Sequence, residues 1–416
     1  MLPALHRLVR WQWTWVTTYL PRIWPPSRDQ IAPKENIPGA DFTKVGTVEP
    51  VEPVESVESV GHPSHEFPIM TEDQYKRLRK NFIESLDSTA ICDLASKHND
   101  EGKACRVVTK TSGSFNVCFF VEFDGEGPKW VVRVPIEPAF EDAWAKLQSE
   151  VATIQYLKQE TRVPVPCIYA YGRDATLTKS GTGTQMFIIS EFVQGHPLNK
   201  SVLKSTDDEH KETFYSQLID VLAELRKLEF PAMGSLMPNS GGGRRPQVGP
   251  VISMSATTLR QPHNKTMVVG PVRSSLRGPF TSALEYMKYQ LSLVSAFLLL
   301  PVSDHTIDDI KEEIFAFCSM EQASQGLFTS RLVEEPCVLQ HLDLRSANII
   351  VDEEFNIKGI IDWEFSGTIP RQLFAPPSWV TGHDLDEMHE EMDADFRAVL
   401  DKKRRVHARY QQLWEE

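Results

Sequence analysis

The stretch that decides the fold is residues 337–367, CVLQHLDLRSANIIVDEEFNIKGIIDWEFSG. It contains two apolar runs rich in β-forming residues, Asn348–Val351 and Ile357–Ile361, with the polar turn DEE between them. This pattern predicts a β-hairpin. Four polar side chains lie at the ends of the two runs: His341, Asp343, Asn348 and Asp362. The hairpin is therefore expected to hold proton-binding and metal-binding groups side by side at its open end.

These residue types suit the transfer of a phosphoryl group, because that reaction mainly requires divalent cations and an attacking hydroxyl group to be held in place. In this interpretation Asp343 accepts the proton of the hydroxyl group. Asn348 and Asp362 supply the hard oxygen ligands that Mg²⁺ takes from proteins, where one or two carboxylates are usual. We include His341 and Arg345 in the candidate catalytic set, with His341 as a brace of the loop rather than a participant in the chemistry.

The segment HLDLRSAN, followed by IIDWE, resembles the H-x-D-x-x-x-x-N and D-W-E motifs of the aminoglycoside phosphotransferase family, a branch of the protein-kinase-like fold. Asp343 and Asp362 are 19 positions apart (362 − 343), which leaves room for one β-hairpin. A chance occurrence of the first motif is the alternative, and the second motif at hairpin distance argues against it. The resemblance, which is to a fungal type of member, implies ATP or GTP and Mg²⁺ as cofactors and a small-molecule hydroxyl acceptor.

Length and composition fit a globular protein with one large core or two lobes, since 41% of the 416 residues are hydrophobic and 24% are charged. The formal charge of −13 argues against a nucleic-acid partner, which would require a basic surface. Six cysteines are scattered without a C-x-x-C pair, which predicts reduced, buried thiols in an intracellular protein. The longest apolar run beyond the N-terminus, Leu291–Val302, is shorter than the ~18 residues of a membrane span, so no transmembrane helix is expected.

The N-terminal residues 1–28 carry four arginines and no acid, with apolar residues at helical spacing. Such a segment resembles a mitochondrial presequence, although Pro3 and the low serine content weaken that interpretation. A membrane-surface or disordered arm is the alternative, so cytoplasmic and mitochondrial locations both stay open. Residues 29–70 are polar and proline-rich and are expected to form a disordered linker, because they contain too little apolar surface to offset the entropy of ordering.

The first lobe is expected over residues 71–195 and begins with a helical pattern from Thr71 to Leu94. Three antiparallel strands are predicted at 105–110, 116–123 and 129–134. The turn TSGSFN between the first two lies where a kinase-like fold places the loop that covers the nucleotide phosphates. The nucleotide-binding candidates in this turn are Ser112, Gly113, Ser114 and Asn116. An ordinary hairpin turn is the alternative, because a single glycine is a weak signal.

A charged pair is predicted between the third strand and the helix that follows it. Glu150 falls on the apolar stripe of a helix over 139–160 and therefore needs a cationic partner. In the family that the chain resembles, a strand lysine pairs with such a glutamate and reaches the nucleotide phosphates, and here Arg133 occupies the strand position. Arginine binds carboxylates and phosphates in a bidentate way, so the exchange need not abolish nucleotide binding. A surface salt bridge is the alternative.

Two more strands are predicted at 167–171 and 186–192, and the second ends in SEFVQG, which resembles the hinge between the lobes of a kinase. The resemblance implies that backbone groups of Glu191 and Val193 bind the adenine edge. The second lobe then covers residues 196–416.

The second lobe is expected to begin with a helix that a capping box at Thr206–Glu209 opens and that runs to about Leu228. Residues 231–278 are too long for a simple connection. In the family that the chain resembles this region covers the acceptor site, and a mobile surface loop is the alternative. Further helices are predicted at 281–300 and 303–319. The acidic segment 384–395 either attracts a cationic acceptor or forms a solvated helix face.

These elements predict a two-lobed α+β architecture of the protein-kinase-like type, with a small β-rich N-lobe and a larger, mainly helical C-lobe. Two functions stay open. One is a phosphotransferase with a small-molecule alcohol as acceptor; the other is a nucleotide-binding or scaffold protein without catalysis, which Arg133 and the single loop glycine favour. All groups of the catalytic constellation are present, so the enzyme is preferred. The sequence identifies neither the acceptor nor the oligomeric state, because one fold serves many substrates.

Overall fold

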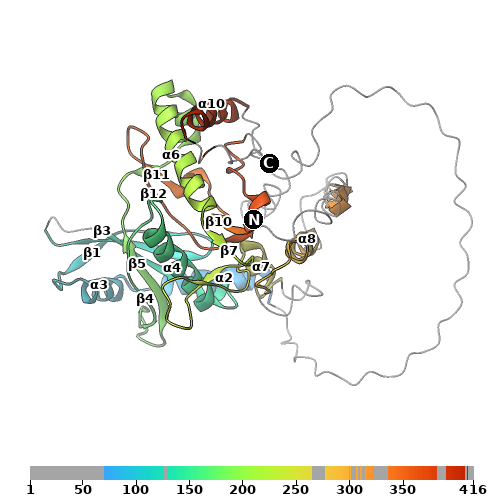
Figure 1. The fold of residues 1–416 in the computed structure, drawn as a ribbon. Helices are drawn as coiled ribbons and strands as arrows, with labels where there is room; N and C mark the ends of the chain where they lie inside the picture. Colours follow the sequence, from blue (N-terminus) through green and yellow to red (C-terminus); the bar gives the residue numbers. More distant parts are fainter. Residues whose placement is uncertain are drawn as a thin grey trace, which may run out of the picture.

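The computed structural model describes residues 70–125, 129–264, 277–298, 336–381 and 390–407, together with Tyr410 and scattered positions between 300 and 322. These residues form the predicted two-lobed α+β fold, with a β-rich N-lobe and a mixed, mainly helical C-lobe (Figure 1). The targeting arm 1–28 and the linker 29–70, except for Met70, lie outside the described residues, and so do parts of the predicted helix 303–319 and of the acidic segment 384–395.

The N-lobe is built on a five-stranded antiparallel sheet in the order β1-β2-β3-β5-β4. Its strands are β1 (Cys105–Ser112), β2 (Asn116–Phe123), β3 (Lys129–Pro135), β4 (Ile168–Ala175) and β5 (Gln185–Glu191). The 3₁₀ turn η1 (Glu137–Ala139) and helix α4 (Ala143–Glu160) connect β3 to β4. Leu147 and Val151 of α4 pack against Ile188 of β5. The five strands predicted for this lobe are therefore confirmed.

Two helices precede the sheet where one was predicted: α2 (Glu72–Ser85) and α3 (Ser88–Lys97). The predicted start is confirmed, because Thr71 and Gln74 form a reciprocal capping box. The helix ends at Leu86, which is extended and buried. Asp87 then donates its backbone N–H to the Leu177 carbonyl at 2.8 Å and caps α3 with its carboxylate. Burial of Leu86 and a new cap thus outweigh the helical periodicity.

The connection between the lobes is fixed to the catalytic hairpin. Strand β6 (His196–Pro197) pairs with β11 (Ile349–Val351), and β11 pairs with β12 (Ile357–Ile360). Gly195 precedes β6 with φ +128°, and a Cβ at this position would lie 2.4 Å from the Val351 carbonyl oxygen. Glycine is therefore required where the chain passes from one lobe to the other.

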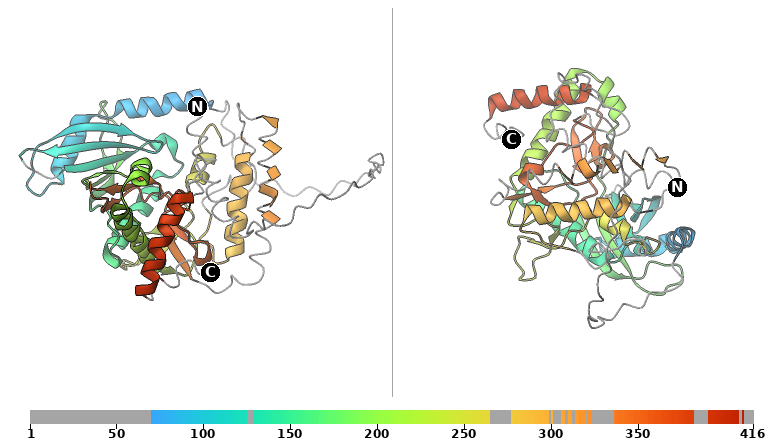
Figure 2. Two further views of the ribbon diagram at one scale, coloured as in Figure 1. Left: turned by 90° about the horizontal axis from the view of Figure 1, so that it is seen from above. Right: turned by 90° about the vertical axis from the view of Figure 1, so that its right-hand side faces the viewer.

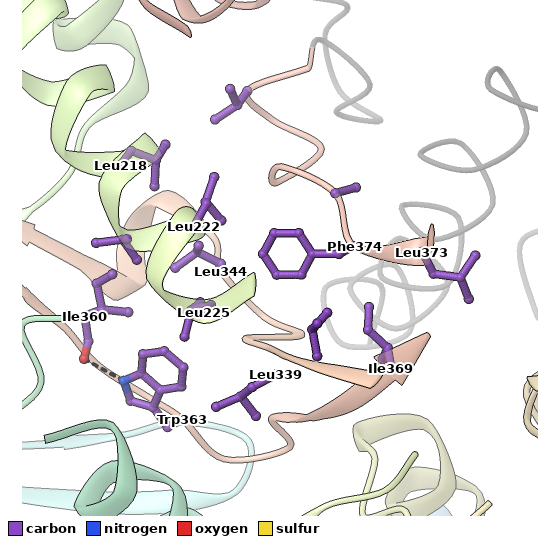
Figure 3. Packing of buried hydrophobic residues seen from close by; sticks show 14 of the residues in the cluster. Leu218, Leu222, Leu225, Leu339, Leu344, Ile360, Trp363, Ile369, Leu373 and Phe374 are labelled. Carbon is purple, nitrogen blue, oxygen red and sulfur yellow. Dashed lines mark hydrogen bonds between the residues drawn. The ribbon is translucent and has the colours of Figure 1, made fainter. Parts of the chain in front are cut away.

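The C-lobe core forms around α6 (Asp208–Arg226), against which α10 (Glu390–Val406) packs. In Figure 3, leucines of α6 face Trp363, whose indole N–H donates to the Ile360 carbonyl at 2.9 Å. A second small sheet beside this core consists of β7 (Glu229–Phe230), β10 (Cys337–Gln340) and β13 (Gly367–Pro370), with the 3₁₀ turn η4 (Arg371–Leu373) after it. The core thus anchors both ends of the 337–367 stretch.

The predicted capping box at the start of α6 is wrong. A short helix, α5 (Lys200–Ser205), ends at Thr206. Asp207 caps α6 instead, because its carboxylate accepts from the His210 N–H at 2.9 Å. A carboxylate adds favourable charge at the helix N-terminus, which a threonine hydroxyl cannot do.

The long segment 231–278 contains regular structure in its described part: β8 (Leu236–Met237), β9 (Gln247–Val248) and α7 (Met254–Leu259). The helix predicted at 281–300 is confirmed as α8 (Ala283–Leu298). All six cysteines are free, as predicted, but only Cys337 is fully buried and Cys318 is exposed. Among the helices in the described part of the chain, none combines the length and the apolar character needed to cross a membrane.

Candidate active site

The loop between β10 and β11 is held by hydrogen bonds among its own polar residues. His341 Nδ1 accepts from the Asp343 N–H at 3.2 Å, so Nε2 carries the ring proton and donates to the Ile361 carbonyl at 3.0 Å. Asn348, in the 3₁₀ turn η3 (Ser346–Asn348), donates from Nδ2 to the Asp343 carbonyl at 2.8 Å and to its carboxylate at 3.3 Å. The loop therefore holds the Asp343 carboxylate in one orientation.

The three candidates for catalysis in this loop differ in their access to a substrate. The Asp343 side chain is 16% exposed, and the half-exposed Arg345 places its Nε 3.5 Å from the Asp343 carboxylate. His341 is 3% exposed, and burial lowers the pKa of its imidazole. Asp343 and Arg345 can thus meet a ligand, whereas a neutral His341 supports the loop from below.

Asp362 follows β12 and lies next to Asn348. The Ile361 N–H donates to the Asn348 carbonyl at 3.0 Å, so the two segments are paired at this point. Asp362 has φ +66°, in the left-handed region that few residues other than glycine occupy. Such backbone strain is kept mainly at functional sites, where the surrounding structure enforces it.

Asn348 and Asp362 are the residues of this loop that could hold a Mg²⁺ ion. The Asn348 amide nitrogen is engaged by Asp343, so its amide oxygen is the atom that can bind a cation. Mg²⁺ usually takes one or two carboxylates and completes its octahedron with water and phosphate oxygens. Across the described residues, no group of three or more His, Cys, Asp or Glu side chains is arranged as a metal site.

Arg133 of β3 connects the two lobes through three carboxylates. It forms an ion pair with Glu150 of α4, as predicted. Its Nη2 also lies 3.3 Å from Asp362 Oδ1 and 3.4 Å from Glu364 Oε2. The Arg133 side chain is 15% exposed and Glu150 is fully buried, so this pair is not a surface salt bridge. The planar guanidinium allows one side chain to serve several carboxylates.

Two charged residues of this cluster, Lys146 and Glu364, had no predicted role. Lys146 is 2% exposed, contacts Glu364, and places its Nζ 3.8 Å from Glu150 Oε2 and 3.4 Å from Asn116 Oδ1. A signal for Lys146 was present, because it precedes Glu150 by four positions, a spacing that puts both on one face of α4. Glu364 is the third residue of the D-W-E motif, of which only the first was assigned a role.

The cluster carries a surplus of negative charge. Arg133 and Lys146 face the carboxylates of Glu150, Asp362 and Glu364, so two cations meet three anions. Burial lowers the pKa of the Lys146 ammonium to about 8, against the attraction of Glu150. Burial alone would also lower the pKa of Arg133, but Glu150 and Asp362 more than offset it and raise that pKa. Arg133 is therefore a permanent cation, and the remaining negative charge favours a bound divalent ion.

The turn between β1 and β2 carries the candidates for the phosphate-covering loop. Ser112, Gly113 and Ser114 are exposed, and a Cβ at Gly113 would meet no atom within 4 Å. Asn116 is buried and donates to Glu364 Oε2 at 2.8 Å. Three of the four candidates thus lie at the open tip, and Asn116 contacts the D-W-E segment of the other lobe.

The hinge residues Glu191 and Val193 lie apart from the charged cluster. The Glu191 N–H donates to the Cys167 carbonyl at 2.9 Å, and its carboxylate accepts from the Cys167 N–H at 3.1 Å. Val193 packs against Gly359 of β12, where an added Cβ would lie 2.7 Å from Val193 Cγ1. In the described part of the chain, neither residue shares a hydrogen bond or an ion pair with Arg133. The hinge therefore contacts the catalytic hairpin through packing.

A family model for the phosphotransferase enzyme family (APH) matches residues 111–372. The match is well over half of the chain and extends from the tip of the β1–β2 turn to the end of β13 and beyond.

Fungal proteins resemble the chain over much of its length. It is 28% identical over 255 residues to clavilactone A biosynthesis cluster protein Y of Ampulloclitocybe clavipes, which is 59% of this chain and 57% of that protein. It is 24% identical over 372 residues to the protein named altered inheritance of mitochondria protein 9, mitochondrial, of Zygosaccharomyces rouxii, which is 78% of this chain and 58% of that protein. The chain thus spans less than two thirds of the length of these relatives.

Solved structures resemble the chain at low sequence identity. The streptomycin–ATP–APH(2")-IIa ternary complex has a TM-score of 0.44 at 14% identity, with 79% of this chain and 83% of that chain covered. Plasmodium vivax ethanolamine kinase has a TM-score of 0.40 at 15% identity, with 80% and 85% covered.

Proposed function

Because the chain belongs to the phosphotransferase enzyme family, we propose that it transfers the γ-phosphoryl group of ATP or GTP to a hydroxyl group of a small molecule. The observation that carries this proposal is the set of hydrogen bonds that Asn348 makes in the hairpin. One amide, that of Asn348, orients the Asp343 carboxylate through its nitrogen and keeps its oxygen for a cation beside Asp362.

Each residue of the site has a role that its surroundings suit. Asp343, which is partly exposed, accepts the proton of the acceptor hydroxyl and orients that oxygen toward the phosphoryl group. Asn348 and Asp362 would hold Mg²⁺, and Arg133 would face the nucleotide phosphates. Bound Mg²⁺ and nucleotide would supply the phosphoryl group and neutralise the charge that develops on it. Glu191 and Val193 bind the adenine edge with backbone groups.

A small acceptor is favoured over a protein substrate. Protein kinases carry an arginine directly after the loop histidine and an A-P-E motif beyond the metal-binding aspartate. Here Leu342 follows His341, and no A-P-E follows Asp362. Efficient phosphorylation of generic protein substrates, with no activity on small hydroxyl compounds, would contradict this preference.

Exchange of the two aspartates tests the proposal. Nucleotide consumption should be measured over a panel of small hydroxyl compounds for wild type, Asp343→Asn and Asp362→Asn. Both variants should lose activity by at least ~100-fold, the usual size of a lost acid–base or metal contribution. Mg²⁺-dependent nucleotide binding should persist in Asp343→Asn and weaken in Asp362→Asn. Asp100→Asn, an exposed change outside the site, is the matched control. Wild-type turnover in both variants would refute the assignment of this hairpin as the active site.

One observation supports a second function, a nucleotide-binding or scaffold protein that does not turn over. Arg133 already lies on Asp362, one of the two proposed cation ligands. If this pair persisted with nucleotide bound, the protein would bind nucleotide without transferring phosphate. Binding of Mg-ATP by a wild-type protein that consumes no ATP with any acceptor would favour this function.

We also propose a mitochondrial location. The arginine-bearing, acid-free residues 1–28 suit import, and the Zygosaccharomyces rouxii relative is named as a mitochondrial protein. A fluorescent protein fused to residues 1–30 should enter mitochondria, and the same fusion with its arginines replaced by glutamine should not. A diffuse cytosolic signal from the unaltered fusion would rule the proposal out.

A further inference from the structure

Helix α2 lies before the residues that match the family model and had no predicted role. It runs along one side of the N-lobe sheet (Figure 2) and reaches the tip of the β1–β2 turn. There Arg79 donates from Nη2 to the Gly113 carbonyl at 3.0 Å and to the Ser114 carbonyl at 2.8 Å. These are two of the residues expected to cover the nucleotide phosphates.

The two hydrogen bonds fix the direction of the neighbouring amides. The Gly113 carbonyl shares its planar peptide unit with the Ser114 N–H, and the Ser114 carbonyl shares its unit with the Phe115 N–H. In a trans peptide the C=O and N–H groups point in opposite directions. Because Arg79 draws both carbonyls to one side, both N–H groups face the other side. In the described structure neither N–H has a hydrogen-bond partner.

The tip is also held from below. The Phe115 carbonyl accepts from the Ile136 N–H at 2.8 Å, and the Gly113 N–H donates to the Asn116 carbonyl at 2.9 Å. The Phe115 ring is buried and lies edge-on to Phe365, 5.0 Å between centroids, just after the D-W-E motif. The N–H groups of Ser114 and Phe115 therefore belong to a fixed turn, and adjacent fixed N–H groups can form a concave site for anions.

Helix α2 is held in place near both ends, which fixes the position of Arg79. Tyr75, one turn before Arg79 on the same face, is buried and stacks on His263 at 4.5 Å between ring centroids. At the C-terminal end, Lys110 donates to the Ile83 carbonyl at 2.8 Å and Lys179 to the Glu84 carbonyl at 2.7 Å. Cations at this end also favour the helix dipole.

We propose that Arg79 is a positioning residue for nucleotide binding, which aims the Ser114 and Phe115 amides at the phosphates of the bound nucleotide. The proposal deepens the proposed function and rests on it. It assigns to α2, outside the family-matched segment, a direct part in forming the phosphate site. Arg79 acts through the peptide groups of the loop and does not touch the nucleotide.

Ligands with and without phosphate test this role. Affinities of wild type, Arg79→Ala and Arg79→Lys should be measured for Mg-ATP, inorganic tripolyphosphate and adenosine. Arg79→Ala should weaken Mg-ATP and tripolyphosphate by about tenfold, the size of one or two lost charge-assisted hydrogen bonds. Adenosine binding and the melting temperature should stay within error, and Arg79→Lys should recover part of the loss. Arg77→Ala is the matched control, because Arg77 is exposed two positions away and does not share the face of Arg79.

Hydrogen exchange separates positioning from general destabilisation. In Arg79→Ala, amide exchange should rise in the peptide over residues 111–118 and stay unchanged in β3 and β5. Equal loss of adenosine and tripolyphosphate binding, or unchanged binding of both with unchanged exchange at the tip, would overturn the proposal. If wild type binds Mg-ATP and Arg79→Ala does not, but wild type consumes no ATP with any acceptor, the proposed phosphotransferase activity is wrong and the role of Arg79 is supported. If wild type turns over ATP and Arg79→Ala binds Mg-ATP as tightly as wild type, the proposed activity is supported and the role of Arg79 is wrong.

Discussion

Arg133→Ala should destabilise the protein strongly, because it leaves buried carboxylates without their cation. Removing one partner of a buried ion pair typically costs roughly 3–5 kcal/mol. We expect about 3 kcal/mol here, the lower end of that range. The reason is that Lys146 remains 3.8 Å from Glu150 and still contacts Glu364. At roughly 2 °C per kcal/mol for a large domain, the melting temperature should fall by about 6 °C.

Arg133→Lys should show a smaller loss, about 1 kcal/mol, because one ammonium keeps the charge but cannot reach all three carboxylates as a planar fork does. In the resembling family a lysine serves at this place, so this variant should retain or raise turnover, whereas Arg133→Ala should lose it. Lys129→Ala on the same strand is the matched control. Its side chain is 52% exposed and pairs with Glu122 at 3.5 Å, and such surface pairs are worth about 0–1 kcal/mol.

The assay is urea unfolding and thermal melting of the four proteins, each with and without Mg-ATP, beside turnover. If Arg133 faces the phosphates, Mg-ATP should raise the melting temperature of wild type and Arg133→Lys and have little effect on Arg133→Ala. A melting temperature of Arg133→Ala within 2 °C of wild type, with unchanged turnover, would refute the argument.

Three further outcomes follow from single contacts. Lys146→Met should cost about 3 kcal/mol in urea unfolding, and Lys146→Met/Glu364→Gln should recover most of it; losses that simply add would show that the two side chains are not coupled. Gly195→Ala should cost at least about 2 kcal/mol, because its Cβ would meet the Val351 carbonyl oxygen at 2.4 Å; a tolerated alanine would contradict this geometry. Burial lowers the pKa of His341 in the folded state, so below about pH 6.5 the proton binds to the unfolded chain in preference to the folded one. The free energy of unfolding should therefore decrease by at most about 1.4 kcal/mol for each unit by which the pH is lowered. His341→Gln should make the decline in melting temperature between pH 7 and pH 5.5 shallower, and equal slopes would count against a buried neutral imidazole.

The catalytic hairpin and the N-lobe strands could be predicted because their signals are local. Alternation of apolar residues locates the strands, and an acid on an apolar stripe indicates that Glu150 needs a cationic partner. The choice of Arg133 as that partner follows from the resemblance to the family. The break at Leu86 could not be predicted, because it depends on a hydrogen bond from Asp87 to Leu177, 90 positions away (177 − 87). Periodicity cannot report a partner at that distance.

The parts of the site that the sequence did not reveal depend on contacts between segments far apart in the sequence. Lys146 shares a helix face with Glu150, but charged helix residues are usually solvated, and its contact with Glu364 depends on the packing of the other lobe. Arg79 is likewise an ordinary helical arginine until the fold brings it to the carbonyls of Gly113 and Ser114. Long-range partners of this kind are determined by packing of the whole chain.

The contacts between the lobes have a consequence for the rate of nucleotide association. Arg133 and Asn116 of the N-lobe bind Asp362 and Glu364 of the C-lobe, and Phe115 lies on Phe365. The lobes are therefore held together by the protein's own side chains in the absence of nucleotide, and we expect these contacts to open before a nucleotide enters. The observed association rate should then stop rising at high nucleotide concentration, where it equals the rate at which the contacts between the lobes open. The same contacts that shape the site would thus limit the rates at which a nucleotide binds and leaves.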